Sequence, residues 1–458
     1  MPLRRRSLAA LVLLSGLALA AALFVRPGKA EPDETMLRYS LELLAANAEV
    51  RLAALEAIRQ SGRKDAIPAL IQARRYLQGL HEVDAVLREL TGDSERDSWH
   101  EWMLWQEAHP EVVPYEGFDI FKSAVFQRID PNFGLFLQPG VTHEIRLEEI
   151  VWGGVVKDGI PALTNPALLE ASEADYLTED ELVFGVTING DARAYPLRIM
   201  DWHEMFNDVI GGVPVSLAYC TLCGSGILFE TTVAGRDTPF VFGSSGFLYR
   251  SNKLMYDQET HSLWNQFTGR PVVGPLTGSG IELKTRPVAI TSWQAWREAN
   301  PETKVLSLET GHRRDYSPGA PYGSYFASPE LMFPALVRQE ALQAKDYVFA
   351  LRSSGTDKAW PLTRFDGGKV INDQAGILDL VLVGDAATRT VRAYRRDGRT
   401  FERGASVAEL KAEDGTWQVT EEALVGPGGE RLARLPGHIA YWFAWAGYLG
   451  EDGELAER

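Results

Sequence analysis

The sequence predicts an α+β protein in which an N-terminal helical segment precedes a duplicated, mainly β (mixed α/β) domain. Apolar residues recur at helical spacing from about residue 37 to residue 110, and short apolar runs separated by glycine turns follow Tyr115. The third observation is an internal repeat within the β-rich part. The chain has 458 residues, 45% hydrophobic and 24% charged, which is enough for two to four globular domains.

Residues 1–30 predict a signal peptide or an N-terminal membrane anchor. Three arginines, Arg4–Arg6, precede the apolar run Leu8–Val25, and small residues suited to cleavage lie near Ala22 and Ala30. The run is longer than a usual signal core and about the minimum for a spanning helix, so cleaved and anchored forms both stay open. In either case the basic flank stays in the cytoplasm. We therefore expect an extracytoplasmic protein, in the periplasm or on the outer face of the cytoplasmic membrane.

The net charge of the chain argues against a nucleic-acid partner. It is −16 at pH 7, and no basic stripe with interleaved aromatic residues offsets it. An acidic surface repels phosphates. We therefore expect no nucleic-acid binding, and we expect contact with a membrane only through the N-terminal segment.

The helical segment is expected over residues 31–112. Apolar residues from Val50 to Ile58 follow helical spacing, Gly62 predicts a break, and a second helix is expected to open near Pro68. The stretch Glu49–Leu77 resembles a HEAT-type helical repeat. Such helix pairs serve as docking surfaces or spacers, so the resemblance implies a protein partner. A small helical cap on the next domain is the alternative.

The internal repeat joins two parts of the β-rich region. Residues 183–197 align without gaps on residues 348–362, and the same offset of 165 carries Asn207-Asp208 onto Asn372-Asp373. A Trp-x-x-Trp pair also recurs at a slightly shorter offset, as Trp293 and Trp296 and as Trp442 and Trp445. The predicted organisation is a first copy over 113–300, a connecting segment over 301–345, a degenerate second copy over 346–450 and a tail over 451–458.

The repeat separates structural residues from residues that carry chemistry. Residues kept in both copies are best explained as determinants of the fold. By contrast, three residues of the first copy that could carry chemistry are replaced in the second. His203 falls on Gly368, Cys220 on Asp385 and Cys223 on Thr388. We therefore expect the site chemistry in the first copy alone.

Cys220 and Cys223, the only two cysteines of the chain, are predicted at the tip of a β-hairpin. Thiols at this spacing are a metal-ligand pair or a redox pair. A disulfide here would close only a short loop, so a purely structural staple explains the pair poorly. Cys-x-x-Cys-Gly is also typical of a zinc knuckle, in which Gly224 permits a positive φ.

Further ligands or catalytic groups are expected from two places. His203 is the candidate third metal ligand, because it disappears from the second copy together with the cysteines. Asp257, Glu259 and His261 alternate in sequence, so a strand there would point all three to one face. They could complete a metal shell, or the two carboxylates could act as acid and base. Met255 would suit copper if it faced inward.

Several chemistries fit the motif poorly. In thioredoxin-like proteins a helix follows the cysteine pair, whereas Gly224–Gly226 and a strand pattern follow here, which weakens but does not exclude that interpretation. A c-type haem site requires His directly after the second cysteine. The spacings of a zincin helix, a zinc deaminase and a nucleophile elbow are also missing. The turn-rich segment Gly311–Gly323 could line a ligand site, but a solvated linker explains it better.

Several motifs together resemble the bacterial domain-of-unknown-function family 3179, over roughly residues 116–450. They are Asp158–Leu163, Ala192–Leu197, Trp202–Glu204 with Asn207-Asp208, Tyr219–Gly224, Ser245–Tyr249, and Leu254–Asp257 with Ser262–Trp264. The resemblance implies an exported protein and the same His and Cys positions, and it supplies no reaction. Thr221 stands where the family pattern has Pro, and His261 stands where a carboxylate or amide is more usual.

Three hypotheses follow from the sequence. The leading one is a membrane-anchored extracytoplasmic protein with one zinc or copper site formed by Cys220, Cys223, His203 and His261. The second is a thiol–disulfide oxidoreductase that uses the same cysteine pair. The third is a non-enzymatic scaffold that docks a partner through the HEAT-like segment. The catalytic residues stay open, with Asp257 and Glu259 as candidates.

Overall fold

The computed structural model describes residues 32–76, 82–337, 339, 341–353, 355–449 and 454–456. Residues 32–458 belong to one compact unit, and the sequence-based boundaries within it stay predictions. The predicted signal or anchor lies outside the described residues. Within the described ranges, no helix combines the length and the apolar character that crossing a membrane requires.

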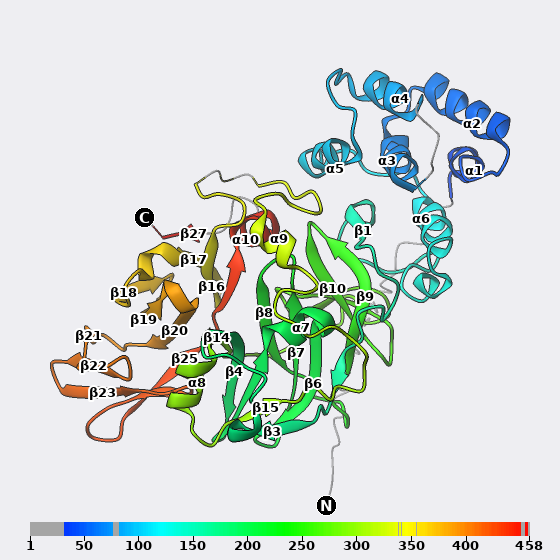
Figure 1. Cartoon of the computed structure of the whole chain (residues 1–458). Helices are drawn as coiled ribbons and strands as arrows, with labels where there is room; N and C mark the ends of the chain where they lie inside the picture. Colours follow the sequence, from blue (N-terminus) through cyan, green and yellow to red (C-terminus); the bar gives the residue numbers. More distant parts are fainter. Residues whose placement is uncertain are drawn as a thin grey trace, which may run out of the picture. The chain divides into compact units, whose positions relative to one another are not determined.

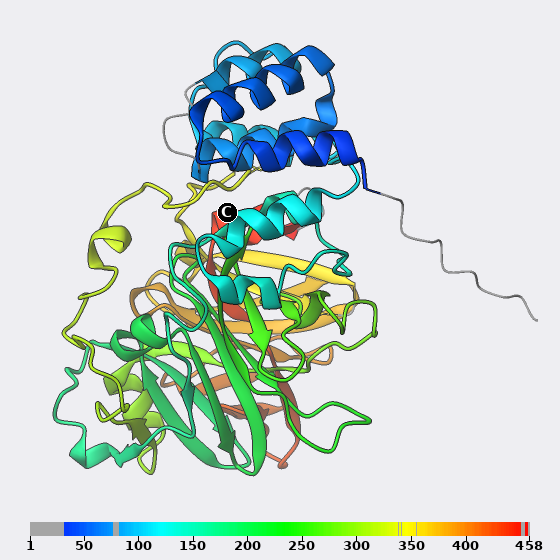
Figure 2. The ribbon, with the colours of Figure 1, turned by 90° about the vertical axis from the view of Figure 1, so that its right-hand side faces the viewer.

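The predicted helical segment is confirmed. It comprises α1 (Glu34–Glu42), α2 (Ala48–Ser61), α3 (Ile67–Tyr76), α4 (Glu82–Thr91) and α5 (Trp99–Ala108), drawn in blue in Figures 1 and 2. The Asn47 side chain caps α2 by accepting from the Glu49 amide at 2.8 Å, and Gly62 ends the helix with φ of 64°. Ser98 and Glu101 form a capping box at the start of α5. Local sequence signals therefore set the limits of these helices.

A sixth helix, α6 (Phe118–Gln127), stands where the sequence analysis expected β-rich structure from Tyr115 onward. That expectation is wrong, because Phe118, Phe121 and Val125 form a buried stripe at helical spacing. In the middle of this helix the buried Lys122 ammonium donates to the Ile150 carbonyl at 2.6 Å. The helices also share one hydrophobic core with the sheet that contains Ile150, Phe247 and Leu263. The segment thus covers the β-rich body, while a docking role for it stays a prediction.

The first copy contributes two sheets. One has the order β14-β4-β5-β15-β3 and the other has the order β13-β8-β7-β6-β2. Their strands are β14 (Ala289–Ser292), β4 (Leu182–Ile188), β5 (Asp191–Pro196), β15 (Lys304–Leu306), β3 (Leu168–Glu170), β13 (Thr285–Arg286), β8 (Ser225–Glu230), β7 (Val213–Cys220), β6 (Met205–Ile210) and β2 (Leu163–Thr164). The short helices α7 (Leu197–His203) and α8 (Trp293–Ala299) follow β5 and β14.

A third sheet is formed mostly from the chain between β8 and β13. Its order is β1-β9-β10-β11-β12, and all but β1 of its strands come from this insertion. They are β1 (Ile150–Trp152), β9 (Phe242–Tyr249), β10 (Asn252–Asp257), β11 (Leu263–Asn265) and β12 (Arg270–Val273). We call β9–β12 the insertion sheet.

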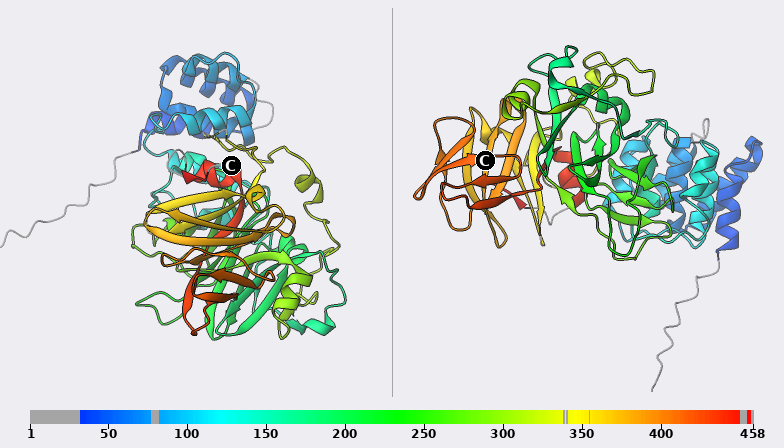
Figure 3. Two further views of the ribbon diagram at one scale, coloured as in Figure 1. Left: turned by 90° about the vertical axis from the view of Figure 1, so that its left-hand side faces the viewer. Right: turned by 90° about the horizontal axis from the view of Figure 1, so that it is seen from below.

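The second copy repeats the frame of the first. It has one sheet of order β26-β16-β17-β27 and a longer one of order β18-β19-β20-β25-β24-β23-β22-β21 (Figure 3). The strands are β16 (Tyr347–Ser353), β17 (Thr356–Pro361), β18 (Lys369–Ala375), β19 (Leu378–Asp385), β20 (Thr390–Arg395), β21 (Glu402–Arg403), β22 (Glu409–Ala412), β23 (Gly415–Val419), β24 (Ala423–Val425), β25 (Arg431–Leu435), β26 (His438–Tyr441) and β27 (Glu454–Leu455), with α10 (Trp442–Leu449) after β26.

Strand register confirms the duplication residue by residue. The antiparallel pair Leu182↔Ser292 recurs as Tyr347↔Tyr441, and the parallel pair Ala194↔Val305 recurs as Ala359↔Leu455. In both copies the partner of the first strand leads directly into the helix that carries the Trp-x-x-Trp pair. A shift of the strand pairing by a single residue would turn every side chain to the other face of the sheet. The agreement therefore means that equivalent residues face the same side of the sheet in both copies.

The Asn-Asp pair kept in both copies has the same structural role twice. Asn207 exchanges two hydrogen bonds of 2.9 Å with the Phe242 backbone, and Asn372 exchanges two of 2.8 Å with the Phe401 backbone. Asp208 and Asp373 each accept from a buried aromatic side chain, Tyr195 or Trp360, of the preceding strand, which belongs to the other sheet of the same copy. These residues hold the frame together, as the repeat predicts.

Candidate functional site

Cys220 and Cys223 form a disulfide at the tip of the β7–β8 hairpin. Cys220 is the last residue of β7 and pairs with Ser225, the first residue of β8, which confirms the predicted hairpin. The Cys223 amide donates to the Cys220 carbonyl at 3.1 Å, and Gly224 follows with φ of 59°. A Cβ at Gly224 would lie about 3 Å from two tyrosine rings of the second copy, so the turn and its packing both require glycine.

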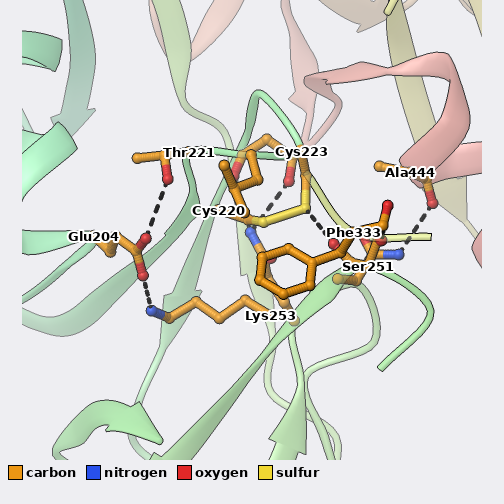
Figure 4. The surroundings of a disulfide bond; sticks show 12 residues. Glu204, Cys220, Thr221, Cys223, Ser251, Lys253, Phe333 and Ala444 are labelled. Carbon is orange, nitrogen blue, oxygen red and sulfur yellow. Dashed lines mark hydrogen bonds and ion pairs between the residues drawn. A yellow bond between two sulfur atoms is a disulfide. The ribbon is translucent and has the colours of Figure 1, made fainter. Parts of the chain in front are cut away.

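The disulfide is buried under three other parts of the chain. The Cys223 sulfur lies 3.1 Å from the Ser251 carbonyl oxygen of the insertion sheet (Figure 4). The Cys223 carbonyl accepts from the Tyr441 amide of the second copy at 2.8 Å, and the Leu222 carbonyl accepts from the Tyr325 hydroxyl at 2.8 Å. Tyr325 belongs to residues Tyr316–Leu336, which include α9 (Gly323–Ala327) and which we call the strap.

A buried ion pair lies on the other side of the disulfide loop. The Lys253 ammonium contacts the Glu204 carboxylate and donates to the Ser244 hydroxyl at 3.0 Å. The other Glu204 oxygen accepts from Thr221, the residue directly after Cys220, at 3.1 Å (Figure 4). Glu204 ends α7 in the left-handed region with φ of 54°, a conformation that costs a residue with a side chain on the order of 1–3 kcal/mol. Tertiary contacts therefore hold this carboxylate beside the cysteine loop.

Asp201 adds a second buried carboxyl group to this region. Its Oδ1 accepts from the Tyr219 hydroxyl at 3.1 Å, and Tyr219 directly precedes Cys220. Burial raises the pKa of Asp201 to about 7, and the Glu204 charge acts in the same direction. A carboxyl group with a pKa near neutral pH is therefore hydrogen-bonded to the residue that directly precedes Cys220.

His203 points away from the cysteine loop. Its Nδ1 lies 2.8 Å from the Pro161 carbonyl, so this nitrogen carries the proton, and its Nε2 accepts from the Tyr316 hydroxyl at 2.6 Å. Burial lowers the pKa of His203 to about 4, so the ring is neutral near pH 7. The segment Gly311–Gly323 thus packs on α7 through Tyr316, and through Asp315, whose carbonyl accepts from Trp202.

Asp257, Glu259 and His261 do not lie on one strand face. That expectation is wrong, because β10 ends at Asp257 and a tight turn follows. Asp257 accepts from the Thr260 amide at 2.6 Å and from the Trp264 indole at 2.9 Å, which is a structural role. Glu259 pairs with Arg236 at the surface. The His261 ring stacks on that of Tyr256, with the ring centres 6.0 Å apart.

In the structure the two cysteines are bonded to each other, and neither His203 nor His261 joins them. Within the described ranges, no three His, Cys, Asp or Glu side chains are grouped where they could hold a metal ion. Met255 is buried in the same hydrophobic core as the disulfide. Zinc or copper binding by Cys220, Cys223, His203 and His261 stays a prediction, and in the disulfide form the sulfurs are not thiolate ligands.

The sequence analysis assigned no role at the site to the residues that surround the disulfide: Asp201, Glu204, Thr221, Ser251 and Lys253. Two signals pointed to the first two. Glu204 lies within the motif Trp202–Glu204 and Asp201 directly precedes it, and at the repeat offset Glu204 falls on Lys369, a reversal of charge. Nothing local marks Lys253, whose partner is 49 residues away in the chain.

The fold and the site define a class of protein. It is a β-rich protein built from two copies of one unit, with a buried disulfide at one hairpin tip of the first copy and an ordinary turn at the equivalent tip of the second. The family described as Protein of unknown function (DUF3179) matches residues 157–452, and the chain belongs to this family. No curated protein and no solved structure matches the chain.

Proposed function

We propose that the protein is an extracytoplasmic thiol–disulfide redox protein whose active pair is Cys220 and Cys223. Its N-terminal segment would export it or anchor it to the membrane. Disulfides form and persist outside the cytoplasm, so that location suits a pair that alternates between disulfide and dithiol.

The observation that carries the proposal is the equivalent hairpin of the second copy. There Asp385↔Thr390 closes a loop of the same length, and the Asp385 carboxylate accepts from the Ala387 amide at 3.0 Å. The frame thus forms this loop without a disulfide. A crosslink across so short a loop would add at most about 2 kcal/mol. A stabilising role alone explains the cysteine pair poorly, whereas a chemical role requires both sulfurs at this spacing.

The reaction is reversible exchange with an external dithiol. One thiolate of the dithiol attacks a sulfur of the disulfide, and the displaced cysteine takes up a proton. The second thiol of the dithiol then attacks the mixed disulfide. The protein gains two electrons and two protons, and the partner leaves as a disulfide.

A redox titration of the folded, full-length protein tests the proposal. The protein, exported in its native compartment, is equilibrated with dithiothreitol couples, and its free thiols are counted by alkylation and mass spectrometry. We expect reversible two-electron reduction above about −300 mV, the range of exchangeable disulfides. The variant Cys220→Ser/Cys223→Ser should show no change in thiol count. A disulfide that is reduced only after unfolding would refute the proposal.

The metal hypothesis concerns the same pair in its reduced form. Two thiolates at this spacing are suitable ligands for zinc or copper, and His203 or His261 would have to move to join them. Elemental analysis of the reduced protein, purified without chelators, tests this alternative. One equivalent of metal that is lost in Cys220→Ser/Cys223→Ser would favour the metal site.

A further inference from the structure

The two sulfurs of the disulfide have different surroundings. The Cys223 sulfur lies 3.1 Å from the Ser251 carbonyl oxygen, and Cys223 is 0% exposed. A carbonyl oxygen carries partial negative charge, so it accepts a hydrogen bond from a thiol and disfavours a thiolate. Burial away from water disfavours the thiolate further. In the dithiol form this position therefore favours a protonated cysteine.

The Ser251 carbonyl is aimed at Cys223 by a strained turn. Arg250 and Ser251, the two residues between β9 and β10, have φ of 48° and 58°, in the left-handed region. This conformation is unfavourable for any residue other than glycine, so the surroundings must hold the turn. The Arg250 guanidinium donates to Glu149 at 2.7 Å. The Ser251 hydroxyl lies 2.8 Å from the Pro334 carbonyl of the strap, to which it donates.

Cys220 has no comparable partner. In the described part of the chain, no donor or acceptor lies at hydrogen-bond distance from its sulfur, and the residue is 3% exposed. In Figure 4, Glu204 and Lys253 lie toward Cys220, whereas Ser251 and Ala444 lie toward Cys223. Both cysteines are buried, so the difference on which the assignment rests is the Ser251 carbonyl beside the Cys223 sulfur.

We infer that Cys220 is the sulfur that exchanges with the external thiol and that Cys223 is the resolving cysteine. This assignment rests on the proposed function. The attacking thiolate forms a bond to the Cys220 sulfur and the Cys220–Cys223 bond breaks. Because the Ser251 carbonyl disfavours a thiolate at Cys223, Cys223 takes up a proton as it leaves and then donates it in a hydrogen bond to that carbonyl. Because both cysteines are buried, the attack requires the strap to move away from Leu222, which Tyr325 covers.

The test uses two full-length variants with one cysteine each. In Cys223→Ser only the Cys220 thiol remains, and in Cys220→Ser only the Cys223 thiol remains. The rate of reaction with 5,5′-dithiobis(2-nitrobenzoate) is measured from about pH 5 to about pH 10, a range that brackets the usual pKa of a thiol. Near neutral pH we expect Cys220 to react at least about tenfold faster, as a pKa difference of one implies.

A second measurement reports the hydrogen bond itself. The S–H stretching band should lie at lower frequency in Cys220→Ser, where the Cys223 thiol can donate to Ser251, than in Cys223→Ser. Circular dichroism and thermal unfolding confirm that both variants are folded. Equal rates, a faster Cys223, or no reaction of either thiol would overturn the assignment.

These outcomes are distinct from those of the redox titration. If the wild-type disulfide resists dithiols while Cys220 alone is the reactive thiol, the proposed function fails, and with it the exchange roles of the two sulfurs, whereas the difference in reactivity between the two thiols stands. If the disulfide is exchangeable but Cys223 reacts faster, only the assignment fails.

Discussion

Two hairpin tips of this molecule are built to one plan and differ in chemistry. The β7–β8 tip closes at Cys220↔Ser225 and the β19–β20 tip closes at Asp385↔Thr390, with loops of equal length. The first tip is buried and carries a disulfide, whereas the second is half-buried and is closed by an aspartate side chain. The frame therefore fixes the loop, and the disulfide is an addition to it.

The difference extends to the neighbours of each tip. Asp201 and Glu204 are buried, while their equivalents Asp366 and Lys369 are exposed. Lys253, which pairs with Glu204, belongs to the insertion sheet, and the second copy has β21–β24 at the corresponding point of the chain. The two copies therefore carry different strands at this point, and those of the first copy supply Lys253 and Ser251 beside the disulfide.

The largest effect is expected from breaking the buried ion pair. Lys253→Met should leave the Glu204 carboxylate buried without its counter-charge, which costs about 3–5 kcal/mol in the free energy of unfolding. Chemical denaturation measures it. The double variant Glu204→Gln/Lys253→Met removes both charges and should recover most of the loss. A single variant as stable as the wild type would mean that the first tip does not depend on this pair.

The next effect is a pH dependence confined to the first copy. Burial raises the pKa of Asp201 to about 7 from the unfolded value of 3.8, so the folded state binds more protons between these values. Its contribution to stability is therefore complete below about pH 4 and is lost as pH rises to about 7. Asp201→Asn keeps the acceptor for Tyr219 and should be more stable than wild type above this window, by up to about 4 kcal/mol.

The second copy supplies the matched control for this pH effect. Asp366→Asn changes the equivalent residue, which is exposed, and should leave the profile of stability against pH unchanged within about 0.5 kcal/mol. Unfolding free energies of the three proteins from about pH 4 to about pH 8 decide the matter. Equal profiles for Asp201→Asn and wild type would refute the assigned cause of the pKa shift.

The frame was predictable from the sequence because its information is local or repeated. The offset of 165 relates Leu182 to Tyr347, and the shorter offset of the Trp pair relates their strand partners, Ser292 and Tyr441. Gly62 and Gly224 mark positions with positive φ that favour glycine. These signals act over a few residues or appear twice, so they can be recognised without knowledge of the tertiary structure.

The site was predictable only as far as the two cysteines. Glu204 reaches Thr221 because packing holds it in a left-handed conformation, and Ser251 approaches Cys223 through a turn that a Gly-rich sequence would usually form. His203 was predicted to lie beside the cysteines because it is lost from the second copy together with them. In the structure His203 ends α7 and its ring contacts Tyr316 instead. Contacts of this kind are set by tertiary packing, and the local sequence does not encode them.

A smaller effect tests the part of the frame that both copies share. Asn207→Ala should leave the buried amide and carbonyl of Phe242 without partners, at a cost of about 2–3 kcal/mol. Asn372→Ala removes the same two bonds from Phe401, but Asn372 is half-buried and water can replace it, so about 1 kcal/mol is expected. Denaturant titrations of both variants compare the copies directly. A larger loss of unfolding free energy in Asn372→Ala than in Asn207→Ala would contradict the prediction that the cost follows the burial of the asparagine.

The smallest effect is expected from removing the disulfide itself. Because the second copy closes the same loop with an aspartate, Cys220→Ala/Cys223→Ala should fold with the same hairpin and lose at most about 2 kcal/mol. Thermal unfolding and the amide exchange of β7 and β8 measure this loss. A matched variant, Asp385→Ala, removes the cap of the other tip and should cost about 1 kcal/mol. If the cysteine variant instead unfolded the first copy, the disulfide would be a structural requirement, and the contrast between the two tips would no longer argue for redox chemistry.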